Sequence, residues 1–338
     1  MNKDILIWGA GAVGGTIGAY LARAGHNVTF VDLALEHVEA IRDSSRGLSI
    51  LGPIDKFTVT APALTPEQVQ GVWPRVFLAV KAHHTEQACR ALMPHLAADG
   101  YILSLQNGLC EKVIAGIVGA QRTVGAFVNF GADWIAPGEI LYSNHGAVVV
   151  GEIDGAVTPR LRELHAALQA FEPEALLSDD IWSYLWGKLG YLSLLFAQAV
   201  GQLGIADCLA RKEYLPLWRA LAGEAVKVAH AEGITPRAFN GFEPTAFDLR
   251  ATEAQAQSSV DAMVRFNRPN PKTHSGMWRD LAIRRRTEVD MQLALIVSIG
   301  RSHGIDCPKT DALVRMIHEI EDGGRPLSDR NLDELVNA

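Results

Sequence analysis

A short apolar strand followed by a glycine-rich turn opens the chain and limits most strongly what it can fold into. Residues 5–8 read Ile-Leu-Ile-Trp, and the six that follow form the pattern Gly-x-Gly-x-x-Gly: Gly9, Ala10, Gly11, Ala12, Val13 and Gly14. In such a turn the first glycine permits the tight bend, the second lets the backbone approach a pyrophosphate, and the third lets the next helix pack on the strand. That helix, expected over 16–24, would direct its free N–H groups at the phosphates.

A second strand, expected over 27–31, ends in Asp32, 18 residues after Gly14. A carboxylate at this place accepts hydrogen bonds from ribose hydroxyls and repels a 2′-phosphate. No Arg or Lys follows until Arg42, so no nearby cation would neutralise that phosphate. We therefore predict that the glycine turn and Asp32 bind a dinucleotide, with NAD(H) favoured over NADP(H). The alternative is that Asp32 serves only as a turn or N-cap residue.

The length of 338 residues and a change of pattern along the chain indicate two domains. The first half alternates strands and helices, whereas long helical patterns with almost no strand signal begin at Asp180. We expect an α/β dinucleotide-binding domain over 1–176 and an all-helical substrate domain over 177–338, with the site in the cleft between them. The long helices of the second half are expected at 180–200, 213–232, 280–302 and 308–321.

Composition narrows the partners to small molecules. The net charge of -7 disfavours nucleic acid and anionic membranes. Four cysteines without a CxxC pair are typical of reduced thiols in a cytoplasmic protein. Residues 181–200 have the length of a membrane span, but Lys188 and several polar residues interrupt them, so we expect a buried central helix that favours a homodimer.

Two other kinds of site are disfavoured. His83 with His84, and His303 with Cys307, lack a partner pair at ligand spacing, so no metal is expected. The segment 300–304 matches the Gly-x-Ser-x-Gly pattern of hydrolases, but that motif needs a strand before it and a helical pattern precedes it here.

Four residues are candidates for chemistry. Lys188 is a lone cation in an apolar segment, where burial is costly without a purpose and lowers a lysine pKa toward that of a usable proton donor; the alternative is that it extends to solvent. Glu288 lies in a charged run that would ordinarily be a solvated helix face. Lys81 and Asn107 each follow a strand, at the edge where open α/β sheets bind ligands, although Asn-Gly is also a common turn.

In this order the motifs resemble the ketopantoate reductase (2-dehydropantoate 2-reductase) family. The matching elements span essentially the whole chain: Gly9–Gly14, Val80-Lys81, Leu105–Gly108, Trp186–Leu189 and Arg286–Asp290. The resemblance implies a Rossmann domain followed by a helical domain of the 6-phosphogluconate dehydrogenase C-terminal type. It also implies hydride transfer between a nicotinamide and a 2-keto acid or its alcohol.

The resemblance gives each candidate a role. Lys188 would be the general acid that protonates the nascent alkoxide, and Glu288 would orient the substrate or Lys188. Asn107 and Lys81 would line the nicotinamide and substrate side. This suits the chemistry, because hydride arrival builds negative charge on oxygen, which a preplaced ammonium stabilises and protonates.

The chain departs from the family where the substrate would be gripped. The family has asparagines four and eight residues after the lysine, and here these positions are Leu192 and Phe196. The family's serine before a methionine is Gly276 here, with Ser275 one residue earlier. At the second-strand tip, where the family often has a basic residue for NADP, this chain has Asp32. We therefore expect a reductase whose substrate carries an apolar group.

Two alternatives stay open. One is a genuine 2-dehydropantoate 2-reductase of pantothenate biosynthesis, with pocket polarity supplied from elsewhere. The other is a non-catalytic nucleotide-sensing protein that kept the fold, against which the presence of both Lys188 and Glu288 argues.

Overall fold

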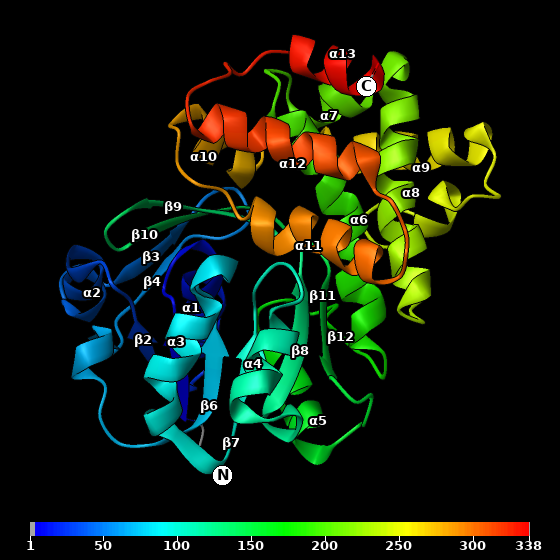
Figure 1. Ribbon diagram of the computed structural model, residues 1–338. Coiled ribbons are helices and arrows are strands. Elements are labelled where there is room, and N and C mark those ends of the chain that lie inside the picture. The colour runs from blue at the N-terminus through cyan, green and yellow to red at the C-terminus, as the bar shows by residue number, and fades with distance from the viewer. Residues whose placement is uncertain (1–3, 338) are drawn as a thin grey trace. The chain divides into compact units, whose positions relative to one another are not determined.

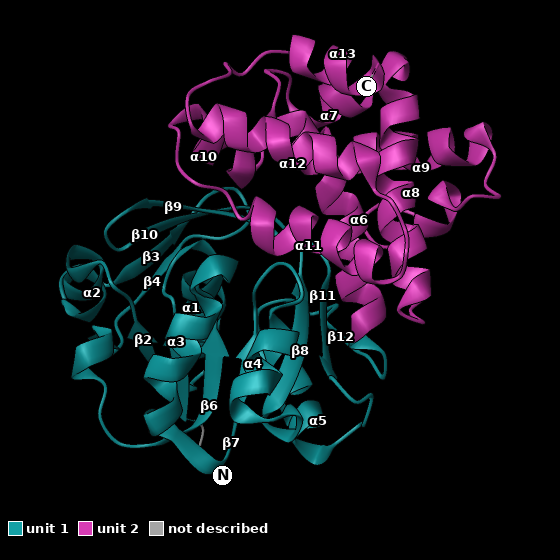
Figure 2. Ribbon diagram, in the orientation of Figure 1, with its two compact units in different colours: residues 1–181 teal, residues 182–338 magenta. Residues whose placement is uncertain are grey.

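A computed structural model of the chain describes residues 4–337 and divides into two compact units, 1–181 and 182–338 (Figure 2). The division falls at the beginning of helix α6 (Ile181–Ala199), five residues after the boundary expected from sequence. Unit 1 combines sheets and helices, and unit 2 is built of helices (Figure 1).

The main sheet of unit 1 has the strand order of a Rossmann domain. Six parallel strands lie in the order β5-β2-β1-β6-β7-β8, which is 3-2-1-4-5-6 when they are numbered along the chain. The predicted fold class of this half is confirmed. These strands are β1 (Asp4–Trp8), β2 (Asn27–Val31), β5 (Ala63–Leu64), β6 (Trp73–Leu78), β7 (Leu96–Ser104) and β8 (Thr123–Val128).

Two further strands extend the sheet beyond β8. Strand β11 (Val148–Glu152) runs antiparallel to β8, and β12 (Leu176–Leu177) runs parallel to β11. A smaller sheet has the order β4-β3-β10-β9. Its strands are β3 (Leu48–Leu51), β4 (Phe57–Val59), β9 (Gly131–Ala136) and β10 (Glu139–Asn144).

Helix α1 (Ala12–Arg23) lies against both sheets through its glycines. A Cβ added at Gly15 would lie 2.3 Å from Cδ1 of Ile140 in the small sheet, and one at Gly18 would lie 2.4 Å from the ring of Phe30 in the main sheet. The helix begins at Ala12 rather than at 16, because Gly11 acts as its N-cap and Gly14 is already helical. The other α-helices of this unit are α2 (Leu35–Arg42), α3 (Thr85–Leu92), α4 (Cys110–Val118) and α5 (Pro159–Leu168).

Unit 2 is arranged around the apolar helix α6, whose side chains are almost all buried. Helix α11 (Val289–Ser302) packs on α12 (Pro308–Glu321) and on α8 (Leu215–Ala231). The remaining helices are α7 (Ile205–Leu209), α9 (Glu253–Asn267), α10 (Gly276–Ala282) and α13 (Arg330–Asn337). Within residues 4–337, no helix, α6 included, is both long enough and apolar enough to cross a membrane.

The continuous helix expected over 280–302 is wrong. Helix α10 ends at Ala282, and α11 begins at Val289. Arg284 adopts a φ of 53°, which an L-residue cannot repeat within a right-handed helix. The chain therefore turns between the two helices, and Glu288 comes directly before α11 instead of lying on a long helix face.

Candidate active site

The three glycines of the N-terminal turn differ in how tightly they are packed. Gly9 has a φ of +103°, and a Cβ there would lie 2.8 Å from the backbone of Ala79 and Val80. A Cβ at Gly14 would lie 2.1 Å from the carbonyl oxygen of Gly9. At Gly11, by contrast, a Cβ would meet no heavy atom of the described chain within 4 Å. The first and third glycines are thus required by packing, and the second leaves the backbone open to a ligand.

The same turn leaves the N-terminus of α1 without a side-chain cap among the described residues. The first turn of a helix has N–H groups with no intrahelical partner, and the helix dipole is positive at this end. With Gly11 as N-cap, this end can bind a phosphate through its backbone.

Asp32 is fixed by two backbone hydrogen bonds. Its Oδ2 accepts from the N–H of Ala10 at 2.9 Å, and its Oδ1 accepts from the N–H of Ala34 at 3.0 Å. The second bond is that of a turn residue, as the alternative interpretation expected, but the first ties the carboxylate to the glycine turn. Because each carboxylate oxygen has a second lone pair, Asp32 can still accept from a sugar hydroxyl.

The strand register brings the candidate residues of unit 1 to one edge of the sheet. The N–H of Gly9 donates to the carbonyl of Val31, and the N–H of Ala79 donates to that of Trp8, each at 2.8 Å. The segments after β2, β1, β6 and β7 therefore lie in adjacent positions at the carboxyl ends of the strands. Strand order reverses between β1 and β6, which is the switch point where sheets of this kind bind dinucleotides.

Gln106 connects the turns that carry Lys81 and Asn107. Its buried side-chain Nε2 donates to the carbonyl of Val80 at 2.9 Å and to Oγ1 of Thr85 at 2.8 Å. Lys81 is exposed and Asn107 is half-buried beside these anchored positions. In the sequence Gln106 is only one position of the Leu105–Gly108 motif, and its bonds to two turns are visible only in the fold.

In unit 2, Lys188 lies on α6 and is 6% exposed. The alternative in which this lysine extends to solvent is therefore wrong. Leu192 is 4% exposed and Phe196 is fully enclosed. The two follow Lys188 by one and two helical turns, so all three share one face of the helix.

Glu288 is half-buried and acts as the N-cap residue of α11. The turn before it is held by Glu321, whose carboxylate accepts from the N–H and the hydroxyl of Thr287, both at 2.7 Å, and from Arg286 at 2.8 Å. His318 contacts the same carboxylate at 3.1 Å. The sequence gives no sign that Glu321 matters, because it reads as one more acid at the end of α12.

The charge of Glu321 is favoured by these contacts. Burial raises the pKa of this carboxyl, but the hydrogen bonds from Thr287, Arg286 and His318 outweigh burial and hold the pKa below its ordinary value of 4.5. An ionised Glu321 therefore fixes the turn that presents Glu288.

The predicted pocket residues Ser275 and Gly276 begin helix α10. Ser275 is its N-cap, and its hydroxyl oxygen accepts from the N–H of Trp278 at 3.2 Å. The ring N–H of Trp278 in turn donates to the carbonyl of Gly201 at 3.0 Å. The Ser275 hydroxyl thus already has a structural use, whereas Gly276 leaves its Cβ position open within the described chain.

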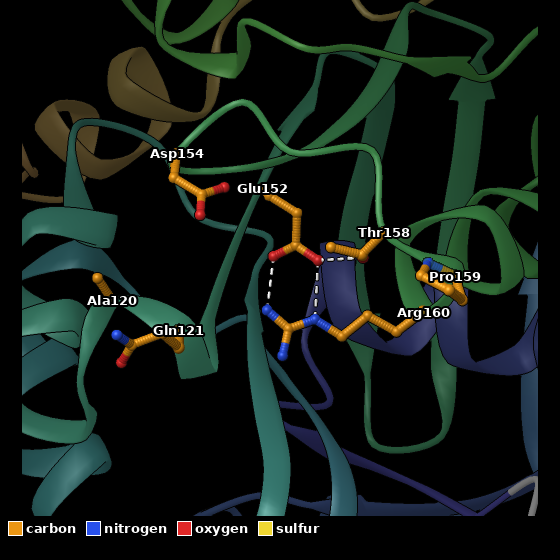
Figure 3. A pocket seen from close by; sticks show the side chains of 7 residues that line it. All are labelled: Ala120, Gln121, Glu152, Asp154, Thr158, Pro159 and Arg160. Carbon is orange, nitrogen blue, oxygen red and sulfur yellow. Dashed lines mark hydrogen bonds and ion pairs between the residues drawn. The ribbon is translucent and has the colours of Figure 1, made fainter.

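A hollow of about 380 Å³ in unit 1 (Figure 3) has none of the candidate residues in its lining. It is found at the end of β11, where Glu152 pairs with Val124 near the beginning of β8, and so at the edge opposite the carboxyl ends of the parallel strands. Glu152 is already bound by Arg160 at 2.6 and 2.8 Å and by Thr158 at 2.6 Å. The residues that line the hollow are Ala120, Gln121, Glu152, Asp154, Thr158, Pro159 and Arg160. Across residues 4–337 no group of three or more His, Cys, Asp or Glu side chains is arranged so that it could hold a metal ion.

Family models match both units. The model described as "Ketopantoate reductase PanE/ApbA" matches residues 5–155, and "Ketopantoate reductase PanE/ApbA C terminal" matches residues 180–321. The chain belongs to the ketopantoate reductase family. As a member of that family it is an oxidoreductase, and the predicted family and overall function are confirmed.

Two curated relatives match this chain over nearly its full length. The 2-dehydropantoate 2-reductase of Archaeoglobus fulgidus is 28% identical over 322 residues, which are 95% of this chain and 99% of that protein. That of Halobacterium salinarum is 27% identical over 326 residues, with the same two shares.

Solved structures have the same fold. A PanE/ApbA family ketopantoate reductase from Ralstonia eutropha JMP134 has a TM-score of 0.79 and 28% identity, covering 95% of this chain and 99% of that one. A D-mandelate dehydrogenase solved with NADH and anilino(oxo)acetate has a TM-score of 0.82 and 22% identity, with the same coverage.

Proposed function

We propose that this chain reduces 2-keto acids with NADH, or oxidises the corresponding 2-hydroxy acids, and that the preferred substrate carries an apolar or aromatic group. The observation that carries the proposal is Lys188, buried on the same face of α6 as Leu192 and Phe196. A buried ammonium surrounded on its own face by apolar side chains suits a carbonyl whose substituent is apolar.

The turn of unit 1 fits a dinucleotide by its backbone. Gly11 leaves open space where a Cβ would stand, and Gly9 and Gly14 are packed as such a turn requires. Asp32 would accept the ribose hydroxyls and repel a 2′-phosphate, which is why we propose NADH over NADPH. A nicotinamide bound there would supply the hydride. Asn107 and Lys81, at the same edge of the sheet, would line its substrate side.

Lys188 is proposed as the general acid. Negative charge develops on the carbonyl oxygen as it is reduced, and the Lys188 ammonium stabilises that charge and donates the proton that completes the alcohol. Glu288 orients the substrate or the lysine. Glu321 holds the turn of Glu288, so it is a positioning residue and does not itself touch the substrate.

The substrate wall, by which we mean Leu192 and Phe196 on the face of Lys188, distinguishes this proposal from a ketopantoate reductase proper. Leu192 and Phe196 cannot bond a buried substrate hydroxyl, and leaving such a group unpaired costs about 1–3 kcal/mol. One structural neighbour is a D-mandelate dehydrogenase, and mandelate is an aromatic 2-hydroxy acid. The second candidate, reduction of 2-dehydropantoate, is favoured by the names of the curated relatives.

Two wider expectations belong to the same proposal. We take 1–176 as the dinucleotide domain and 177–338 as the substrate and dimerisation domain, with a homodimer as the working form. One neighbour of the same fold is a dimeric ketopantoate reductase from Staphylococcus aureus.

A turnover assay tests the proposal. The purified protein is given NADH or NADPH with a panel of aliphatic and aromatic 2-keto acids, and cofactor oxidation is followed together with the chiral alcohol formed. We expect the fastest turnover with NADH and an aromatic or branched apolar 2-keto acid. Tight NADH binding without turnover of any carbonyl or alcohol would instead support the nucleotide-sensing alternative.

A further inference from the structure

His37 of helix α2 connects two distant segments of the chain, one 27 residues before it and one 101 residues after it. Its side chain is 1% exposed, its Nε2 lies 2.8 Å from the carbonyl oxygen of Ala10, and its Nδ1 lies 2.9 Å from the backbone nitrogen of Gly138. Gly138 forms the turn between β9 and β10, and Ala10 lies in the glycine turn. The indole nitrogen of Trp134 also approaches Nδ1, at 3.3 Å.

These contacts fix which ring nitrogen carries the proton. A backbone N–H can only donate, so the Nδ1 that receives it from Gly138 must have a free lone pair. The proton of a neutral imidazole then resides on Nε2, which donates to the carbonyl of Ala10. His37 is therefore a donor toward the glycine turn and an acceptor toward the small sheet.

Ala10 is held from both sides as a result. Its N–H donates to Oδ2 of Asp32, and its carbonyl accepts from His37. The described chain has no cis peptide bond, and in a trans peptide the C=O and the following N–H point in opposite directions. Fixing the carbonyl of Ala10 thus also fixes the direction of the N–H of Gly11, the N-cap of α1.

We propose that His37 is a positioning residue for the cofactor: it holds the Ala10–Gly11 peptide so that the N–H of Gly11 is presented to a pyrophosphate. This role rests on the proposed dinucleotide binding. It assigns a contribution to cofactor affinity to a side chain outside the glycine motif, on the helix after Asp32.

Two substitutions separate the two hydrogen bonds of His37. The amide of Asn lies near the place of Nδ1, so His37→Asn keeps an acceptor for Gly138 but cannot reach Ala10. The amide nitrogen of Gln reaches the place of Nε2, so His37→Gln keeps the donor to Ala10. Trp134→Phe serves as the control, because it removes the third contact and leaves both backbone bonds.

The readout is equilibrium binding, measured by calorimetry for NADH, for ADP-ribose, which carries the pyrophosphate, and for adenosine, which lacks it. We expect His37→Asn to raise the Kd for NADH and ADP-ribose by on the order of tenfold, with the Kd for adenosine unchanged. His37→Gln and Trp134→Phe should bind all three as the wild type does. The kcat of His37→Asn at saturating NADH should stay at the wild-type value, because orientation of the turn affects affinity.

The binding measurements test the role of His37 and the proposed function separately. Wild-type Kd values in a folded His37→Asn protein would overturn the role of His37, and so would an equal loss for adenosine and ADP-ribose, which would indicate a general structural role. If His37→Asn does not fold, His37→Gln decides: a wild-type Kd supports the role and a tenfold weaker one contradicts it. A wild-type protein that binds no NADH would overturn the proposed function itself.

Discussion

The glycine turn of unit 1 and the Glu288 turn of unit 2 both carry residues of the proposed site, but they are stabilised in different ways. The glycine turn is determined by backbone contacts, since Cβ atoms at Gly9 and Gly14 would lie 2.8 Å or less from neighbouring backbone. The Glu288 turn is determined by side chains, because Glu321 binds Thr287 and Arg286. A backbone-determined turn admits few substitutions, whereas side chains on a helix face can change without moving the backbone.

This difference explains which parts of the family pattern the chain keeps. The glycine turn retains its three glycines, and α6 retains Lys188. The two positions that follow on the face of Lys188 are, however, Leu192 and Phe196. Replacing asparagine by leucine on a helix alters polarity with little demand on the main chain. The account therefore predicts a conserved hydride chemistry joined to an altered substrate preference.

The largest expected effect is at Lys188. Lys188→Met keeps the length and apolarity of the side chain and removes the proton donor, so kcat should fall on the order of 10²–10⁴-fold. The Kd for NADH should remain that of the wild type, because the proposed phosphate site lies in unit 1. Lys212→Met, which removes an exposed lysine of the same unit, is the matched control and should keep full activity. Near-complete kcat in Lys188→Met would show that another group supplies the proton.

A smaller effect is expected at Glu321. Glu321→Gln replaces an acceptor of several hydrogen bonds with an amide, so the free energy of unfolding should fall by about 1–3 kcal/mol at neutral pH. The pKa of Glu321 lies below 4.5 in the fold, so its charge stabilises the protein above that pH and the contribution is lost as pH falls through the lowered pKa. As pH falls through this range, the free energy of unfolding should therefore decrease more for the wild type than for Glu321→Gln.

The control for this substitution is Glu319→Gln on the same helix, whose ion pair with Arg325 is largely exposed on the carboxylate side. Exposed pairs contribute about 0–1 kcal/mol. Denaturant unfolding at several pH values measures both variants. Equal destabilisation by the two substitutions would show that Glu321 has no special part in holding the turn of Glu288.

The smallest effect is expected at Asp32. Wild-type kcat/KM should favour NADH over NADPH by at least about tenfold, which corresponds to ~1.4 kcal/mol. Asp32→Ala should narrow that ratio, and because Asp32 also binds the N–H of Ala10, NADH affinity itself should fall. Glu36→Ala removes a nearby exposed acid as the control and should leave the ratio unchanged. A wild-type preference for NADPH would contradict the assignment of Asp32.

Much of unit 1 could be predicted because its elements are local and periodic. The strand at 27–31 is observed at those residues, and the glycine spacing predicted the turn before α1. The expected beginning of α1 at residue 16 is wrong, because Gly14 and Gly15 lie inside the helix although glycine usually disfavours helix interiors. The helix at 308–321 was also predicted at its observed bounds, since Pro308 marks its first residue.

What could not be predicted depends on contacts between distant residues. The turn before α11 is held by Glu321, which binds Thr287 from 34 positions away. The contact of His37 with Gly138 spans 101 positions. Neither residue belongs to a motif, and no local propensity distinguishes His37 or Glu321 from a surface residue of an amphipathic helix.

The measurement that tests the central claim most directly is a side-by-side comparison of kcat/KM for two substrates of the wild-type protein with NADH. The substrates are ketopantoate and phenylglyoxylate, the 2-keto acid formed when mandelate is oxidised. The account predicts that the aromatic substrate is preferred, and that Leu192→Asn combined with Phe196→Asn reduces this preference and improves ketopantoate reduction, if only slightly. A wild-type protein that reduces ketopantoate more efficiently than every apolar 2-keto acid tried would contradict it. The apolar face of α6 would then belong to the core alone, and the substrate wall would have to be found elsewhere in unit 2.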